Sequence, residues 1–202
     1  MVFSDGVIKI DLKRKLEAPS EPVVPKLYGL PKIHKPEPIP VRPIVRSIGS
    51  VTYNLAKHAA HILRPLVGQS LQHLQNTQVF IEKIKDLKLT ASETITLFDV
   101  AALFTSIPPD DAILVVWHAL EKDGSWKERT ALDIDQAVEL IDICLSCYPF
   151  KGSFFKQHEC AMGSPMSPIV ANLCMEPFEV TTLSSYSGTP PKLWLRYVDD
   201  TL

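Results

Sequence analysis

Two short apolar segments of this 202-residue chain end in aspartate. Asp99 follows Ile-Thr-Leu-Phe, and Asp199 and Asp200 follow Leu-Trp-Leu-Arg-Tyr-Val. A carboxylate at the end of a buried strand is costly unless a cation neutralises it, and a divalent cation does so best. If the two strands lie side by side, these acids meet at one point and can hold two Mg²⁺ ions for in-line phosphoryl transfer. The alternative interpretation is two ordinary turns, because Asp is also a common turn and capping residue.

The segments that position these acids predict a mixed α+β fold. Alternating apolar residues indicate strands over residues 94–100 and 192–198, and a short hairpin is expected over 150–157 with Gly152 in its turn. Periodicity and capping residues predict helices over 50–66, 77–89, 108–122, 133–147 and 167–176. Pro177 is expected to kink or end the last helix. The order of elements is not a βαβ pattern.

Charge divides the chain into two unequal parts. Residues 1–66 hold 11 Lys and Arg against 5 Asp and Glu, a net +6. Residues 67–202 hold 10 against 18, a net −8, so the overall charge of −2 conceals the division. Such asymmetry indicates a polyanion-binding region beside a metal-binding or ordinary acidic region. A solvated basic face is the alternative interpretation.

Proline is concentrated near the N-terminus. Eight of the 17 prolines lie between Pro19 and Pro43, so this stretch must run extended. Its apolar residues indicate an ordered arm; they are Leu27, Tyr28, Leu30 and Ile33. Apolar runs reach only about five residues, against the ~20 of a membrane span. The N-terminus carries no secretory apolar block, so a reducing compartment is expected.

Five strings resemble, in family order, the motifs of reverse transcriptases. Tyr-Val-Asp-Asp at 197–200 resembles the metal-binding hairpin, and Asp99 followed five residues later by Phe104 resembles the first catalytic motif. Met-Gly-Ser-Pro-Met-Ser-Pro at 162–168 resembles the Gly-x-x-x-Ser-Pro loop and helix. The two fingers motifs are matched at residues 27–35 and 41–45. The string Tyr-Gly-Leu-Pro-Lys-Ile-His-Lys, with Met-Gly-Ser-Pro, points to Penelope-like retroelements within the family.

The resemblance implies an α+β fold, the fingers and palm of a right-hand polymerase truncated before the thumb. Residues 1–25 are then an N-terminal lead-in, 26–92 a fingers-like region and 93–202 an incomplete palm, together one reverse transcriptase domain fragment. The chain stops two residues after Asp200, so we expect little or no activity from this piece in isolation. Met162 stands where many members of the family have Gln.

By resemblance, the expected activity is that of an RNA-directed DNA polymerase. A nucleotide passes from dNTP to a primer 3′-hydroxyl by two-metal transfer, and pyrophosphate leaves. The implied metal ligands are Asp99, Asp199 and Asp200, helped by the carbonyl of Val100, and the implied cofactor is two Mg²⁺ ions, with Mn²⁺ as a substitute. The implied partners are an RNA template, a DNA primer and dNTP. The implied location is intracellular, in the nucleus for action on chromosomal DNA.

The resemblance also implies the residues that hold the substrates. Lys32 or Lys35, together with Arg42, contacts the triphosphate, since the planar Arg fork pairs two phosphate oxygens. Phe104 is the expected steric gate that excludes a ribose 2′-hydroxyl. Gly163 allows the backbone to approach the base pair closely. The other expected nucleotide or primer–template contacts are Ser164, Pro165 and Tyr197.

Two other functions fit parts of the sequence. A truncated retroelement remnant would at most bind nucleic acid through the basic residues 22–65. A small zinc module would use the pairs Cys144 and Cys147, and His58 and His61. Both pairs lie in predicted amphipathic helices, where small apolar Cys and half-buried His are routine. We therefore expect no zinc site.

Overall fold

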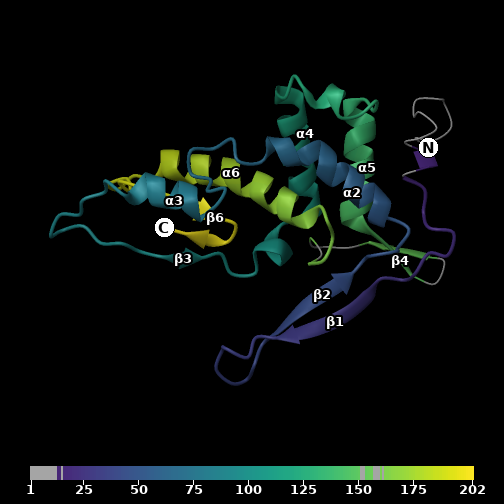
Figure 1. The fold of residues 1–202 in the computed structure, drawn as a ribbon, viewed down its shortest axis with the longest axis horizontal. Helices are drawn as coiled ribbons and strands as arrows, with labels where there is room; N and C mark the ends of the chain where they lie inside the picture. Colours follow the sequence, from purple (N-terminus) through teal and green to yellow (C-terminus); the bar gives the residue numbers. More distant parts are fainter. Residues whose placement is uncertain (1–12, 15, 151–152, 157–159, 161) are drawn as a thin grey trace.

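Helices form the body of the chain in the computed structural model, which describes residues 13–14, 16–150, 153–156, 160 and 162–202. The four that pack together are α2 (Tyr53–Leu63), α4 (Pro109–Lys122), α5 (Ile134–Ser146) and α6 (Ser167–Ser185) (Figure 1). Short 3₁₀ turns follow or connect them: η1 (Arg64–Leu66), η2 (Leu103–Ser106) and η3 (Trp126–Glu128). The predicted positions of these four helices are confirmed, although α6 is longer than predicted.

The apolar faces of these helices enclose one core. Ile62 of α2 and Val116 and Leu120 of α4 are fully buried, because apolar residues three or four positions apart fall on one side of a helix. The contributions of α5 and α6 to the same core are Ala137, Leu140, Ile141, Leu145, Ile169, Val170, Ala171 and Leu173. The start of α6 is therefore fixed by packing, and residues just before it are held with it.

A two-stranded hairpin projects from this body. β1 (Lys26–Pro31) pairs antiparallel with β2 (Val41–Arg46), and Figure 1 shows the hairpin extending away from the helices. Most of its side chains are exposed. The proline-rich stretch is extended as predicted, since proline fixes φ and removes the N–H that a helix needs.

The aspartates lie on a small three-stranded sheet. Its order is β3 (Phe98–Asp99), β7 (Asp200–Thr201) and β6 (Arg196–Tyr197), and both pairings are antiparallel. Each strand has two residues, so the predicted strands over 94–100 and 192–198 are too long. The alternation before Asp99 does not mark a buried face, because Ile95 is 59% exposed.

Two further predicted elements differ from the structure. The second hairpin begins earlier than predicted, with β4 (Cys147–Phe150) and β5 (Ser153–Lys156), and Gly152 lies outside the described residues. The helix predicted over 77–89 is α3 (Thr77–Ile84), and none of its residues is buried. Without a buried face, packing adds little to the weak tendency of a short helix to continue.

Helix α6 runs through Pro177 to Ser185, so the predicted helix end is wrong. Residues on both sides of the proline contact distant parts of the chain: Glu176 accepts a hydrogen bond from the Gly68 N–H at 2.7 Å, and Glu179 is buried against Arg196. Although α6 has 19 residues, no helix in the described part of the chain is both long and apolar enough to cross a membrane.

Candidate functional site

Three aspartates surround one tight turn. Val198 and Asp199 form the turn between β6 and β7, and β7 pairs with β3 so that Asp99 lies directly opposite Asp200. The N–H of Val100 donates to the Asp199 carbonyl at 2.9 Å. The two predicted strands that end in acids are therefore not neighbours, because β7 lies between them. The turn nevertheless brings Asp199 beside the end of β3.

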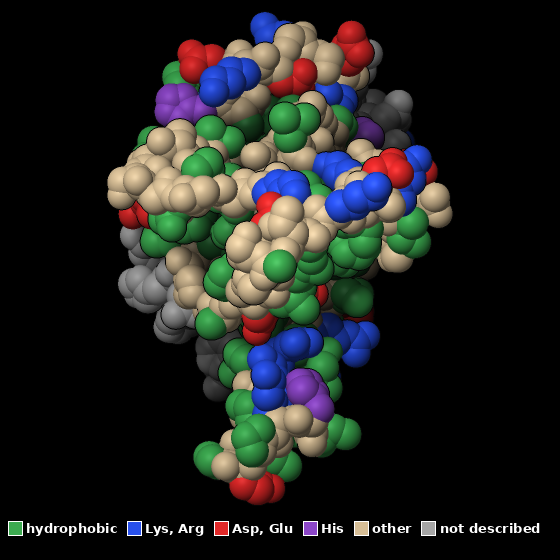
Figure 2. All heavy atoms as spheres, turned by 90° about the vertical axis from the view of Figure 1, so that its left-hand side faces the viewer, with side chains coloured by type: hydrophobic (Ala, Val, Ile, Leu, Met, Phe, Trp, Pro, Cys, Tyr) green, Lys and Arg blue, Asp and Glu red, His purple; other side chains and the backbone are tan. Residues whose placement is uncertain are grey.

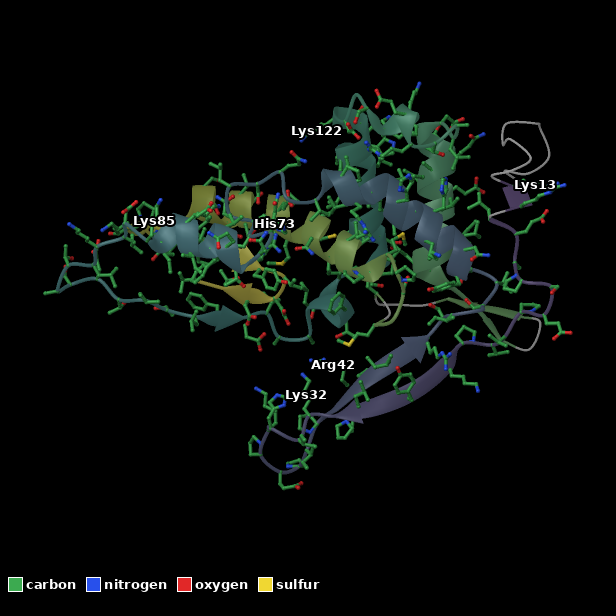
Figure 3. All side chains as sticks on the ribbon, viewed as in Figure 1. Lys13, Lys32, Arg42, His73, Lys85 and Lys122 are labelled. Carbon is green, nitrogen blue, oxygen red and sulfur yellow. The ribbon has the colours of Figure 1, made fainter. Side chains whose placement is uncertain are left out.

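Asp99 and Asp199 line the same open cleft, which has a volume of about 410 Å³. Lys32 and Arg42 line it from the hairpin, and Figure 3 shows both on this projecting part of the chain. The other lining residues are Ile44, Val100, Ala102, Leu103, Phe104, Met162, Gly163, Ser167 and Pro168. Acids and cations that share one cleft suit a ligand that brings both phosphate groups and divalent cations.

Two residues beside the cleft have a left-handed backbone conformation. Ala102 has φ 54° and Val198 has φ 57°. Residues with a side chain rarely adopt this conformation, and for β-branched valine it is an outlier. Such strain persists only where the surrounding structure holds it, and it is typical of functional sites. Ala102 precedes the turn that carries Phe104, and Val198 precedes Asp199, so each strained residue orients a predicted site residue.

The loop before α6 joins the hairpin to the body. The N–H of Val45 in β2 donates to the Met162 carbonyl at 2.7 Å, and Ser47 Oγ donates to the Gly163 carbonyl at 3.2 Å. Gly163 has φ 116°, and a Cβ there would lie 2.3 Å from the Val45 carbonyl oxygen. The expected close approach at this glycine is therefore made to Val45 of the chain itself.

Positive charge near the cleft belongs to the hairpin. Residues 26–46 contain five Lys and Arg and one acid, Glu37. Figure 2 shows Lys and Arg side chains gathered with a histidine on the projecting hairpin. The acids of the cleft come from the opposite side, on β3 and the β6–β7 turn. The cleft thus separates the two signs of charge.

Several predicted site residues do not line this cleft. Asp200 and Tyr197 line a neighbouring groove that is mostly apolar. The other predicted contacts outside the cleft lining are Lys35, Ser164 and Pro165. Among the residues that the structure describes, no three carboxylate, imidazole or thiol groups come close enough to share a metal ion. The cleft therefore offers two carboxylates, Asp99 and Asp199.

Some residues of the site were not predicted from the sequence. Ile44 lies two positions after Arg42 on β2, so strand alternation places both on one face, a signal that the sequence does contain. Arg196 is buried one strand position before the turn, and its signal is a charged residue inside the apolar string Leu-Trp-Leu-Arg-Tyr-Val. Ala102 carries no sequence signal, because its backbone conformation depends on the surrounding fold.

A larger cavity of about 530 Å³ lies elsewhere and has mainly apolar walls, including Phe98, Tyr186 and Trp194. Its charged residues, Lys192 and Glu93, pair with each other at 3.1 Å. The two charged side chains in its lining therefore partly neutralise each other. We place the candidate site in the smaller cleft, because that cleft gathers acids, cations and strained backbone.

One buried thiol, Cys160, lies before α6, and one partly buried thiol, Cys174, lies within it. Burial raises the pKa of Cys160 to about 11 and that of Cys174 to about 12, the latter helped by Cys160 and Asp111. Thiols with such pKa values stay protonated near neutral pH and act as small apolar residues. They pack in the core or against it.

Comparison with known proteins identifies the fold. No protein-family model and no curated protein matches the sequence. Among solved structures, apo telomerase from Candida tropicalis, truncated from its C-terminal domain, matches with a TM-score of 0.52 and 14% identity. The match covers 91% of this chain and 44% of the telomerase chain. The fold resembles part of telomerase.

Telomerase is a reverse transcriptase, so the resemblance predicted from the motifs is supported at the level of fold. The predicted mixed α+β class is confirmed. The chain spans less than half the length of the telomerase structure that it matches. The activity and the assignment to Penelope-like elements are therefore taken up as a proposal.

Proposed function

We propose that this chain is the fingers and palm region of an RNA-directed DNA polymerase of the Penelope-like type. The polymerase adds a nucleotide from dNTP to a primer 3′-hydroxyl on an RNA template. The supporting observation is the cleft in which Asp99 and Asp199 share the lining with Lys32 and Arg42. The identity of the substrates is inferred from the resemblance of the motifs to those of reverse transcriptases. The similarity of the fold to telomerase is consistent with that resemblance.

The cations of the cleft suit a triphosphate. Arg42 presents a planar fork that pairs two phosphate oxygens, and Lys32 adds a compact charge. Ser167 and Pro168 bring the first turn of α6 to the cleft, where the positive end of the helix dipole favours anions. Position and charge neutralisation account for most of the rate in phosphoryl transfer.

The acids of the cleft suit divalent cations. Asp99 and Asp199 line the same cleft, and two like charges in one site repel each other unless a cation neutralises them. Carboxylate oxygens are the ligands that Mg²⁺ prefers, so Asp99 and Asp199 would hold the metal. When bound, Mg²⁺ would lower the pKa of the primer hydroxyl and neutralise the departing pyrophosphate.

The remaining residues would orient the substrates. In the proposed reaction, the primer 3′-oxygen bonds to the α-phosphorus, and the bond from that phosphorus to the β-phosphate bridging oxygen breaks. Pyrophosphate leaves, and the hydroxyl proton passes to solvent water. Phe104 lies in the same cleft as Asp99, where its ring would exclude a 2′-hydroxyl. Gly163 keeps the loop before α6 against β2, which would fix the distance between the cations and the acids.

Primer extension with the natural full-length protein tests the proposal. Asp199→Asn should reduce Mg²⁺-dependent extension on an RNA template by at least ~100-fold, because loss of a direct ligand should exceed the 10- to 100-fold effect typical of outer partners. The melting temperature should not fall, since the change removes one of three neighbouring carboxylates. Glu121→Gln, an exposed acid of α4, is the matched control and should extend normally. Full activity of the Asp199 variant would overturn the assignment.

A second candidate function is nucleic-acid binding without turnover, as in a retroelement remnant. It is favoured by the exposed hairpin with its excess of Lys and Arg. Binding of this kind is strongly weakened by salt. Salt-sensitive RNA binding combined with no extension by the full-length protein would support the remnant, whereas templated extension would exclude it.

A further inference from the structure

Arg196 is completely buried beside the turn that carries Asp199. Its Nε lies 3.0 Å from Glu179 Oε1 in α6, and the exposed fractions of the two side chains are 0% and 1%. Its Nη1 donates to Asn172 Oδ1 at 2.7 Å and to the Val198 carbonyl at 3.2 Å. One guanidinium therefore connects two positions of α6 to the backbone of the turn.

The hydrogen bonds of Arg196 extend to the cleft through Asn172. The Asn172 side chain forms two hydrogen bonds: Nδ2 donates to the Pro168 carbonyl at 2.9 Å, and Oδ1 accepts from Arg196. Pro168 lines the cleft at the start of α6. Trp194 Nε1 donates to Glu179 Oε1 at 3.1 Å and fixes that carboxylate. The network thus joins the helix side of the cleft to the acid side.

Stability does not explain a buried ion pair here. Removing two charges from water costs about as much as their attraction returns, and apolar residues of the same volume often stabilise a protein as well or better. The geometry of the pair is also incomplete: Glu179 Oε2, Arg196 Nε and Arg196 Nη2 are buried and form no hydrogen bond within the described part of the chain, so Nε meets Glu179 Oε1 as an ion pair only. The explanation must lie in what Arg196 holds.

What Arg196 holds is a strained residue. Val198 has φ 57° at the first central position of a tight turn, where glycine is the usual residue. The hydrogen bond from Arg196 Nη1 to the Val198 carbonyl holds the peptide group that leads directly into Asp199. Loss of this bond would free the turn to relax and would move the carboxylate away from Asp99.

We propose that Arg196, fixed by Glu179 and Asn172, is a positioning residue that sets the place of the Asp199 carboxylate in the cleft. The effect of Arg196 on catalysis rests on the proposed polymerase function. The effect of Arg196 on the conformation of the turn does not rest on that function, because it follows from the hydrogen bonds alone.

The first test is amide hydrogen exchange on the full chain. The reporter amides are those that hold the turn and its strands: Val100 N–H, Leu195 N–H and Leu202 N–H. In Glu179→Gln/Arg196→Met, the charges are removed together and an acceptor for Trp194 is kept. These amides should exchange at least ~10-fold faster, while amides of α5 are unchanged, because local opening is independent of the core.

Two more variants make the test specific. Arg196→Lys keeps a charge opposite Glu179, but the shorter ammonium group cannot reach all three partners of Arg196. This variant should therefore also loosen the turn. It tests the positioning role if the double variant does not fold. Val198→Gly removes the strain that Arg196 opposes, and in that background the double variant should have a smaller effect on exchange. A general loss of stability would not be rescued in this way.

The matched control is the partly buried pair of Arg129 and Asp123. Figure 3 shows Lys122, the neighbour of Asp123, on the far side of the body from Arg42. Arg129→Met/Asp123→Asn removes an Arg–carboxylate pair of the same kind, and it should leave exchange at the turn unchanged. If it loosens the turn as much as the Arg196 change does, the positioning role is wrong.

The second test is steady-state primer extension by the natural full-length protein. The Arg196 variants should lower kcat about 10- to 100-fold, as changes in outer partners of metal ligands do. Half-saturation should require more Mg²⁺, and the KM for dNTP should stay nearly constant. Unchanged turn exchange in both Arg196 variants, or a wild-type turn that exchanges without protection, would overturn the positioning role.

The two proposals fail separately. If the wild-type protein does not extend a primer but the variants loosen the turn, the polymerase function is wrong and the positioning of Asp199 stands. If the protein extends a primer and the variants keep both kcat and protection, the positioning role is wrong and the polymerase function stands.

Discussion

Ile141 in α5 is fully buried among the helices of the body, whereas Leu27 in β1 of the hairpin is 72% exposed. Both are large aliphatic residues, and both lie in regular secondary structure. The body gains its stability by removing such side chains from water. The hairpin is held by its strand ladder and by the backbone contact between Val45 and Met162. Charge and an open surface can therefore be maintained on the hairpin without cost to the core.

The largest effect on stability should come from the body. Ile141→Ala should lower the free energy of unfolding by about 2–5 kcal/mol, because the change leaves a cavity in a packed core. The RNA binding expected under the proposed function should be unchanged at temperatures well below the melting transition. Urea unfolding and an RNA titration measure the two quantities.

Leu27→Ala is the matched control in the hairpin and should change the free energy of unfolding by less than ~0.5 kcal/mol. An equal loss from both changes would show that the hairpin shares the core of the body. The contrast between the two regions would then be wrong.

A smaller effect should come from the contact that joins the two regions. Gly163→Ala places a Cβ 2.3 Å from the Val45 carbonyl oxygen at φ 116°, so it should cost ~1–3 kcal/mol of strain and weaken the Val45–Met162 hydrogen bond. Faster exchange of the Val45 amide would show the separation of the hairpin. Gly124→Ala is the control, since a Cβ there meets no atom within 4 Å. Equal effects of the two changes would contradict the role of Gly163.

Within the cleft between the body and the hairpin, Phe104→Ala should change the selectivity for dNTP over NTP more than it changes the stability of the fold. Phe104 packs partly against the core and lines the same cleft as Asp99; under the proposed function, its resemblance to the steric gate of reverse transcriptases predicts that the ring excludes ribonucleotides. Discrimination between dNTP and NTP should fall by about 10- to 200-fold, the range available to a steric pocket. Single-nucleotide incorporation measures it. Phe178→Ala, at an exposed site on α6, should leave discrimination unchanged, and the same result for Phe104 would remove its role as a gate.

The smallest effect concerns pH. Burial, followed by His61, lowers the pKa of His58, and burial, followed by Arg196, lowers the pKa of His73, in both cases below the ordinary value of 6.5. The unfolded chain therefore takes up protons first as the pH falls through about 6.5, so stability is fully present above that pH and declines below it. Urea unfolding between about pH 7.5 and 5.5 measures the slope.

His73→Gln should make this slope shallower. The change should be modest, because Glu176 and Glu179 oppose the lowering of the His73 pKa. A slope that is unaffected would place the proton uptake elsewhere. A stability that rises as the pH falls would contradict the predicted direction for both histidines.

Helix positions could be predicted because their signals are local. The Pro109 start of α4 and the apolar spacing of α2 and α5 depend on residues within a few positions of one another. The strands and the end of α6 could not be predicted. Helix α6 continues past Pro177 to residues that contact distant parts of the chain, such as Glu179 beside Arg196, 17 positions further along, and no local pattern contains that contact.

For the candidate site, residue chemistry was more informative than element boundaries. Asp99, Asp199, Lys32, Arg42 and Phe104 were predicted from motifs, and all of them line one cleft. The expected strand pairing was wrong, and Asp200 lines a neighbouring groove. A motif predicts which side chains form a site. It does not predict on which face of a two-residue strand each of those side chains lies.

By itself the sequence determined the division of charge, the extended proline-rich arm and the identities of the acids and cations. These properties follow from composition, from the fixed φ of proline and from short motifs, all of which are local. Only the tertiary structure decided that the arm folds back as a hairpin over the acids, that Gly163 meets Val45 and that Arg196 holds the turn before Asp199. Arg196 lies only two positions from Val198, but it is held by Asn172, 24 positions away, and Ser47 contacts Gly163 across 116 positions. These longer contacts form because burial and hydrogen bonding are satisfied across the whole chain and not within any one segment.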